Sequence, residues 1–76
     1  MKYSSKDILL HIDYIIDRQQ EDLDELSKLK PLPISQLQKT RYQLANLRLF
    51  RKDLNNGNPD TRILTSIVND MQEFGW

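Results

Sequence analysis

Residues 5–30 read SKDILLHIDYIIDRQQEDLDELSKLK, and this stretch decides the fold. Its apolar residues recur every three or four positions, at Leu9, Ile12, Ile16, Leu23 and Leu26. Because an α-helix turns once in about 3.6 residues, this spacing places them on one helical face. The stretch contains no glycine or proline, and the alternation typical of a β-strand is absent. We therefore expect one long amphipathic helix, capped by Ser4 or Ser5.

Two breaks follow this helix and divide the rest of the chain. The first is KPLP at residues 30–33, and the second is NNGNP at residues 55–59. Closely spaced prolines cannot lie inside a helix, and Asn-Asn-Gly favours a turn. The intervening segments both carry helical apolar spacing, so we expect a second helix over about 35–55 and a third over about 59–74.

Both later helices have candidate caps. Ser35 followed by Gln38 matches a capping box at the start of the second helix, and Pro33 as the first helical residue is an alternative start. Asn58 before Pro59 is typical of an N-cap followed by a first helical residue. Short connections make consecutive helices antiparallel neighbours, so residues 1–76 are predicted to form one all-α domain, an up-down-up three-helix bundle.

The lengths of the helices are unequal, and this has a consequence for the surface. A first helix of about 26 residues would span roughly 39 Å, at about 1.5 Å per residue. The third helix is much shorter and cannot cover the whole first hairpin. Apolar surface would remain open at one end, where a second chain or another protein could cover it. Homodimerisation through the first hairpin is therefore plausible.

The residue inventory argues against catalysis and bound cofactors. There is no cysteine and one histidine, His11, so thiolate metal sites and multi-histidine zinc sites are excluded. We expect His11 to be an exposed helix residue, since no partner constellation is evident. Neither Ser35 nor Ser66 has a histidine nearby to activate it. We expect a protein that is not an enzyme and that holds no metal or cofactor.

Bulk properties bear on location and source. The opening residues lack the long apolar core of a signal peptide, and no run approaches the roughly 20 apolar residues of a membrane span, so we expect a cytoplasmic protein without a membrane partner. Alanine occurs once, at Ala45, among many Ile, Asn, Gln and Lys residues. That bias suits an AT-rich genome, such as that of a low-GC bacterium or phage.

The charge is zero overall but is divided between the helices. The first helix carries seven acids, Asp7, Asp13, Asp17, Glu21, Asp22, Asp24 and Glu25. The second carries five bases, Lys39, Arg41, Arg48, Arg51 and Lys52, with Asp53 as its one acid. The simplest interpretation is that the two helices attract each other across the hairpin and so fix its register.

Two sharper interpretations of the charge remain open. Basic residues of the second helix could contact phosphates of a nucleic acid, with Arg41 and Arg48 seven positions apart on one face. Alternatively, an acidic face of the first helix could occupy a basic groove on another protein. That face consists of Asp13, Asp17, Glu21 and Asp24.

Several large side chains lie off the apolar faces. Tyr42 and Leu49, seven apart on the second helix, are expected to pack under the third helix, or else to form a binding hot spot. Leu10 and Tyr14 form a similar pair on the first helix. Trp76 either folds back onto the bundle or protrudes as an anchor.

These features together predict a small protein-binding module. It would act as a stoichiometric regulator or inhibitor by covering a surface of another protein. The alternative is a nucleic-acid-binding regulator that uses the basic second helix. Candidate contact residues for these functions are Tyr42, Leu49, Arg41, Arg48, Asp13, Asp17, Glu21, Asp24 and Trp76.

Overall fold

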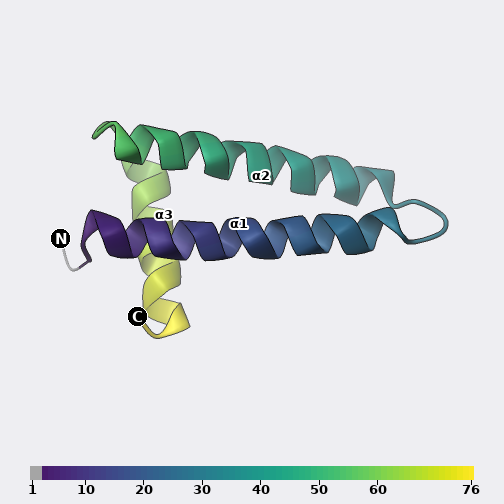
Figure 1. The fold of residues 1–76 in the computed structure, drawn as a ribbon, viewed down its shortest axis with the longest axis horizontal. Helices are drawn as coiled ribbons and strands as arrows, with labels where there is room; N and C mark the ends of the chain where they lie inside the picture. The colour runs from purple at the N-terminus through teal and green to yellow at the C-terminus, as the bar shows by residue number, and fades with distance from the viewer. Residues whose placement is uncertain (1–2) are drawn as a thin grey trace.

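The computed structural model describes residues 3–76 and contains three α-helices. They are α1 (Ser5–Ser27), α2 (Ile34–Asn55) and α3 (Thr61–Phe74). The predicted all-α, three-helix fold is confirmed, and α1 packs along α2 as an antiparallel hairpin. Figure 1 shows that α3 does not run along this hairpin but lies across it, behind α1 and near the end where α1 begins and α2 ends.

The start of α1 follows from its first residues. The Ser4 hydroxyl accepts a hydrogen bond from the backbone N–H of Asp7, and the Asp7 carboxylate accepts one from the backbone N–H of Ser4. This reciprocal capping box satisfies two backbone donors, and the carboxylate also lies at the positive end of the helix dipole. At its other end α1 stops at Ser27, three residues earlier than predicted, ahead of the proline-containing connection.

The predicted capping box of α2 is absent. Pro33 occupies the N-cap position, and no side-chain hydrogen bond caps the helix. The Ser35 prediction was wrong because α2 already begins at Ile34, which places Ser35 inside the first turn. A proline before the helix removes one N–H that would otherwise need a partner, so a side-chain cap is less necessary there.

The cap of α3 also differs from the prediction. Asp60, and not Asn58, caps the helix by accepting hydrogen bonds from the backbone N–H groups of Arg62 and Ile63. Asn58 instead donates its backbone N–H to the carbonyl oxygen of Asp53 at the end of α2, 3.0 Å away, and α3 begins at Thr61, two residues later than predicted.

This cap assignment gives a first testable prediction. An Asp60→Ala variant should lose about 1 kcal/mol of the free energy of unfolding, because two helical N–H groups lose their acceptor. Asn58→Ala is the matched control and should change it by less than about 0.5 kcal/mol. Urea unfolding followed by circular dichroism measures both. A larger loss for the Asn58 variant would contradict the assignment.

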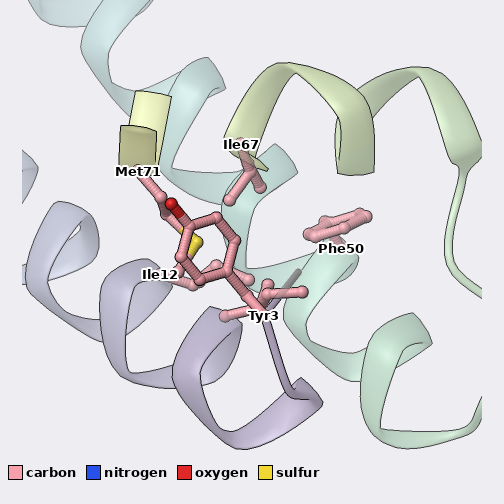
Figure 2. Close-up of a cluster of buried hydrophobic side chains, with 6 residues drawn as sticks. Tyr3, Ile12, Phe50, Ile67 and Met71 are labelled. Atoms are coloured by element: carbon pink, nitrogen blue, oxygen red, sulfur yellow. The ribbon is translucent and has the colours of Figure 1, made fainter. Parts of the chain in front are cut away.

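The core lies where the three helices meet. It consists of Tyr3, Ile8, Ile12, Phe50, Ile67 and Met71. Figure 2 shows these side chains converging, with Ile12 from α1, Phe50 from α2, and Ile67 and Met71 from α3. The Tyr3 hydroxyl also donates a hydrogen bond to the carbonyl oxygen of Trp76, 3.2 Å away, which ties the segment before α1 to the residue after α3.

The position of α3 leaves the far half of the hairpin as two helices only. The expectation that the third helix is too short to cover the hairpin is confirmed, since its core residues meet only the early part of α1 and the late part of α2. Around the connection between α1 and α2, large apolar side chains are exposed, namely Leu29, Leu32 and Ile34. The molecule is accordingly elongated, with extents of 45 × 25 × 17 Å.

Candidate functional site

The most exposed large apolar side chain in residues 3–76 belongs to Tyr42. Its exposed fraction is 70 %, and that of Leu49, seven residues later on α2, is 58 %. The expectation that the third helix covers this pair was wrong. Because α3 packs against Phe50 on another side of α2, the face that carries Tyr42 and Leu49 points away from the bundle.

Arg41 and Arg48 lie beside this apolar pair and are exposed. Within the described part of the chain, neither makes an ion pair. Both line a shallow hollow between the two hairpin helices, together with Gln20, Leu23, Asp24, Leu44 and Ala45. The structure therefore brings four of the predicted contact residues, Arg41, Tyr42, Arg48 and Leu49, onto adjoining surfaces of α2.

One ion pair does cross the hairpin. Arg51 Nε donates a hydrogen bond to Asp13 Oδ1 at 2.7 Å, and Nη2 donates to Oδ2 at 3.4 Å. The hydrogen bond that Arg51 donates to Asp13, together with the negative charge of that carboxylate, raises the pKa of Arg51 above its ordinary value. Both side chains are only partly exposed. The predicted attraction between the charged helices is thus present, in a forked geometry that fixes the antiparallel register.

The other predicted acidic residues are arranged differently. Asp17, Glu21 and Asp24 are exposed on α1, and none makes an ion pair within residues 3–76. Asp24 lines the same hollow as Arg41, whereas Glu21 is not among the residues that line it. The structure therefore separates Asp13, which is engaged by Arg51, from three acids whose carboxylates remain free.

His11 departs furthest from its prediction. It was expected to be an exposed helix residue, but its exposed fraction is 1 %. Its ring lies between two polar side chains that come from α3 and the residues after it. His11 Nε2 is 2.9 Å from Asp70 Oδ2, and Trp76 Nε1 is 3.1 Å from His11 Nδ1. Both ring nitrogens are thus hydrogen-bonded, as a buried imidazole requires.

These contacts fix the tautomer of the imidazole. The indole Nε1 of Trp76 can only donate, so His11 Nδ1 must accept. In the neutral ring the proton then resides on Nε2, which donates to the Asp70 carboxylate. Because Asp70 is exposed on its other side, it can remain hydrated while it orients the ring.

The tautomer gives a second testable prediction. Long-range ¹⁵N–¹H NMR spectra should show the neutral His11 ring protonated at Nε2 and unprotonated at Nδ1. In a Trp76→Phe variant the indole donor is lost while an aromatic ring remains, so the preference for this tautomer should weaken. Phe74→Leu, which removes a neighbouring ring but no hydrogen bond, is the control. A ring protonated at Nδ1 in the unchanged protein would contradict the geometry.

An aromatic group surrounds His11. The Tyr14 and Phe74 ring centroids are 5.0 Å apart, and the Phe74 and Trp76 centroids lie 5.5 and 6.1 Å from that of His11. Of the two alternatives for Trp76, the structure has the residue folded back, with its indole bonded to His11, although 45 % of the side chain is exposed. Tyr14 contacts Phe74 but is 40 % exposed, and Leu10 is 52 % exposed, so α3 covers this pair only in part.

A signal for the burial of His11 was present in the sequence. His11 lies three residues after Ile8 and four before Ile15, so it occupies the helical face that those two residues widen. What the sequence did not show was that Asp70 and Trp76 would supply partners for both ring nitrogens. Those residues are 59 and 65 positions away, and α3 brings them there only by crossing the hairpin.

Residues 3–76 contain no group of three or more His, Cys, Asp or Glu side chains that could hold a metal ion. Among the helices of this same region, none has the length and apolar character needed to cross a membrane. Comparisons of the chain with protein-family models, with curated proteins and with solved structures found no match.

Proposed function

We propose that this protein is a non-enzymatic protein-binding module that acts as a stoichiometric regulator or inhibitor, with the outer face of α2 as its contact surface. The observation that carries the proposal is the exposure of Tyr42 and Leu49 on one helical face. A cytoplasmic setting in a low-GC bacterium or phage belongs to the same proposal and rests on the composition of the chain.

The chemistry of this face supports a protein partner. Tyrosine and arginine are enriched among the residues that contribute most to binding, and such residues act best when surrounding contacts exclude water. Tyr42 offers a large ring with few rotatable bonds, and Leu49 extends the apolar surface by two helical turns. Arg41 and Arg48 lie alongside and are free to pair with carboxylates of another protein.

Lack of catalytic geometry supports the proposal only indirectly. The hollows found over the described residues are open and shallow, and they lie between pairs of helices. His11 is the one buried polar side chain among residues 3–76, and both of its ring nitrogens are engaged, by Asp70 and Trp76. A general base needs a free ring nitrogen directed at a substrate, so His11 is a poor candidate for that role.

A second candidate function is binding of nucleic acid through the same helix. It is favoured by the absence of ion pairs at Arg41 and Arg48 within residues 3–76. It is weakened by the engagement of Arg51 with Asp13, which removes one of the five bases of α2 from such a surface. Phosphate binding would weaken steeply with salt, whereas an apolar protein interface would not.

The test is a pull-down with tagged protein from a nuclease-treated lysate of its own source. The resin is washed at high salt, and bound proteins are identified by mass spectrometry. One foreign protein in stoichiometric amount is the expected result. Recovery of the tagged chain alone would contradict the proposal and would turn attention to nucleic acid, for which a salt titration with an Arg41→Glu, Arg48→Glu variant is the next measurement.

A further inference from the structure

The two broad faces of the α1–α2 hairpin are not equivalent. One is crossed by α3, while the opposite face, towards the viewer in Figure 1, carries no third helix. One hollow is lined by Asp24 of α1 and by Arg41 and Arg48 of α2. Arg41 lies nine positions before Phe50, which packs with α3 in the core, so at about 100° per residue it lies on the opposite side of α2, towards the open face.

Charged residues on this open face form one row on α1 and one on α2, and the members of the two rows lie at matching positions along the hairpin axis. The contact between Asp13 and Arg51 sets the register of the antiparallel hairpin. Asp17 lies one turn after Asp13 in α1, and Arg48 lies one turn before Arg51 in α2. Because the two helices are antiparallel, both steps run in the same direction, so Asp17 and Arg48 lie at the same position along the hairpin axis. Seven residues further in each helix lie Asp24 and Arg41, which are again level and line one hollow.

These two level pairs are not used within the molecule. Asp17, Asp24, Arg41 and Arg48 are all exposed, and among residues 3–76 none of the four belongs to an ion pair. The face therefore offers a free acidic row on α1 and a free basic row on α2, and Leu23, Leu44 and Ala45 line the same hollow.

We infer that the occupant of this face is a second copy of the chain, related by a two-fold axis along the length of the hairpin. Such a rotation stacks α1 of one copy over α2 of the other. It brings Asp24 against the partner copy's Arg41 and Asp17 against the partner copy's Arg48, and the same contacts recur on the other side of the axis.

The same rotation also gives a favourable packing of the helices. Each α1 then has two antiparallel α2 neighbours, its own and that of the second copy, which is the arrangement of a four-helix bundle. Because α3 lies on the opposite face of each hairpin, the two α3 helices stay on the outside and do not collide. A rotation that stacked α1 on α1 would instead oppose acid to acid.

The available area indicates a weak dimer. A face of about 22 residues at about 1.5 Å each and two helices of about 10 Å width covers roughly 660 Å² per copy. The total of about 1,300 Å² lies at the lower end of specific interfaces. With a mostly charged surface and little apolar area, the association should weaken as ionic strength rises.

This dimer is separable from binding of a foreign protein. Tyr42 and Leu49 lie further round α2, on the flank of the proposed four-helix core, so both copies would present them outward. A Tyr42→Ala, Leu49→Ala variant should therefore dimerise like the unchanged protein. In the dimer Arg41 and Arg48 would be engaged by the second copy, so a foreign protein would bind the dimer through Tyr42 and Leu49 alone. The two proposals therefore have separate tests.

The test is sedimentation equilibrium of the full chain with two charge-reversed variants. One is Arg41→Glu, Arg48→Glu, and the other is Asp17→Lys, Asp24→Lys. Each variant alone opposes like charges across the axis and should sediment as a monomer where the unchanged protein is a dimer. An equimolar mixture places an all-acidic face against an all-basic one and should restore a dimer. Lys39→Glu, on the other side of α2, is the control and should stay dimeric.

Circular dichroism spectra of the variants separate loss of association from loss of folding. If one variant is unfolded, the unchanged protein still provides a test, because its dimer should dissociate between low and high salt. A monomer at high micromolar concentration and low salt would overturn the inference. So would variants that remain dimeric alone, or folded variants whose mixture stays monomeric.

Discussion

A Phe50→Ala variant is expected to lose about 3–5 kcal/mol of the free energy of unfolding. Phe50 is 2 % exposed and lies where α1, α2 and α3 meet, in contact with the core that includes Ile67 and Met71. Removing the ring forfeits its burial and leaves a cavity that the crossing helices cannot fully close. A domain of this size has about 4–11 kcal/mol in total, so the variant should be largely or wholly unfolded.

The preceding residue supplies a matched control. Leu49→Ala also shortens a large apolar side chain on the same helix, but Leu49 is mostly exposed. Its effect on stability should be less than about 0.5 kcal/mol, apart from a small gain from the helix preference of alanine. Urea titrations followed by the circular dichroism signal of the helical backbone compare the two variants. Equal losses would show that α3 does not pack on Phe50.

Replacing both Tyr42 and Leu49 by alanine is expected to weaken binding to the foreign protein by at least about 30-fold, equivalent to roughly 2 kcal/mol. The reason is that these two side chains provide the apolar centre of the proposed surface. Isothermal titration calorimetry with the captured partner measures the change. The free energy of unfolding should stay nearly constant, because neither side chain supports the core.

Leu10→Ala is the control for this second prediction. Leu10 is a large exposed apolar residue on α1, with an exposed fraction close to that of Leu49. Its loss should leave the affinity for the partner unchanged. If the Leu10 variant weakened binding as much as the double variant, the contact surface would not be the outer face of α2.

Local rules explain how much of this fold was predictable. The helical spacing in residues 5–30 and the two turn sequences set the number and order of the helices correctly. The errors at the ends, at Ser35 and Asn58, arose because several neighbouring residues could serve as caps. Sequence alone does not show which of them has the backbone angles of an N-cap.

The direction of α3 was beyond local rules. Short connections favour antiparallel neighbours, but the turn before α3 allows the helix to leave at a steep angle, and Figure 1 shows it crossing the hairpin. That one difference accounts for the misplaced residues. It brings Asp70 and Trp76 to His11, which is therefore buried, and it leaves Tyr42 and Leu49 exposed.

The residues of the candidate site could be selected from the sequence, but which of them pair with each other and which remain free could not. Tyr42, Leu49, Arg41 and Arg48 were selected as off-face or charged positions on the second helix, and the structure exposes all four. Charge alone did not distinguish Arg51 from these arginines. Only the hairpin register shows that Arg51 is engaged by Asp13 while Arg41 and Arg48 remain free.

The most direct test of the central claim is photo-crosslinking in cells of the source, with a photoreactive phenylalanine analogue placed at Tyr42 or, separately, at Leu10. We expect the protein labelled at position 42 to crosslink to one foreign protein, and the protein labelled at position 10 to give little of that product. Equal crosslinking from both positions, or crosslinking to the same protein from position 10 alone, would contradict the assignment of the outer face of α2 as the binding surface.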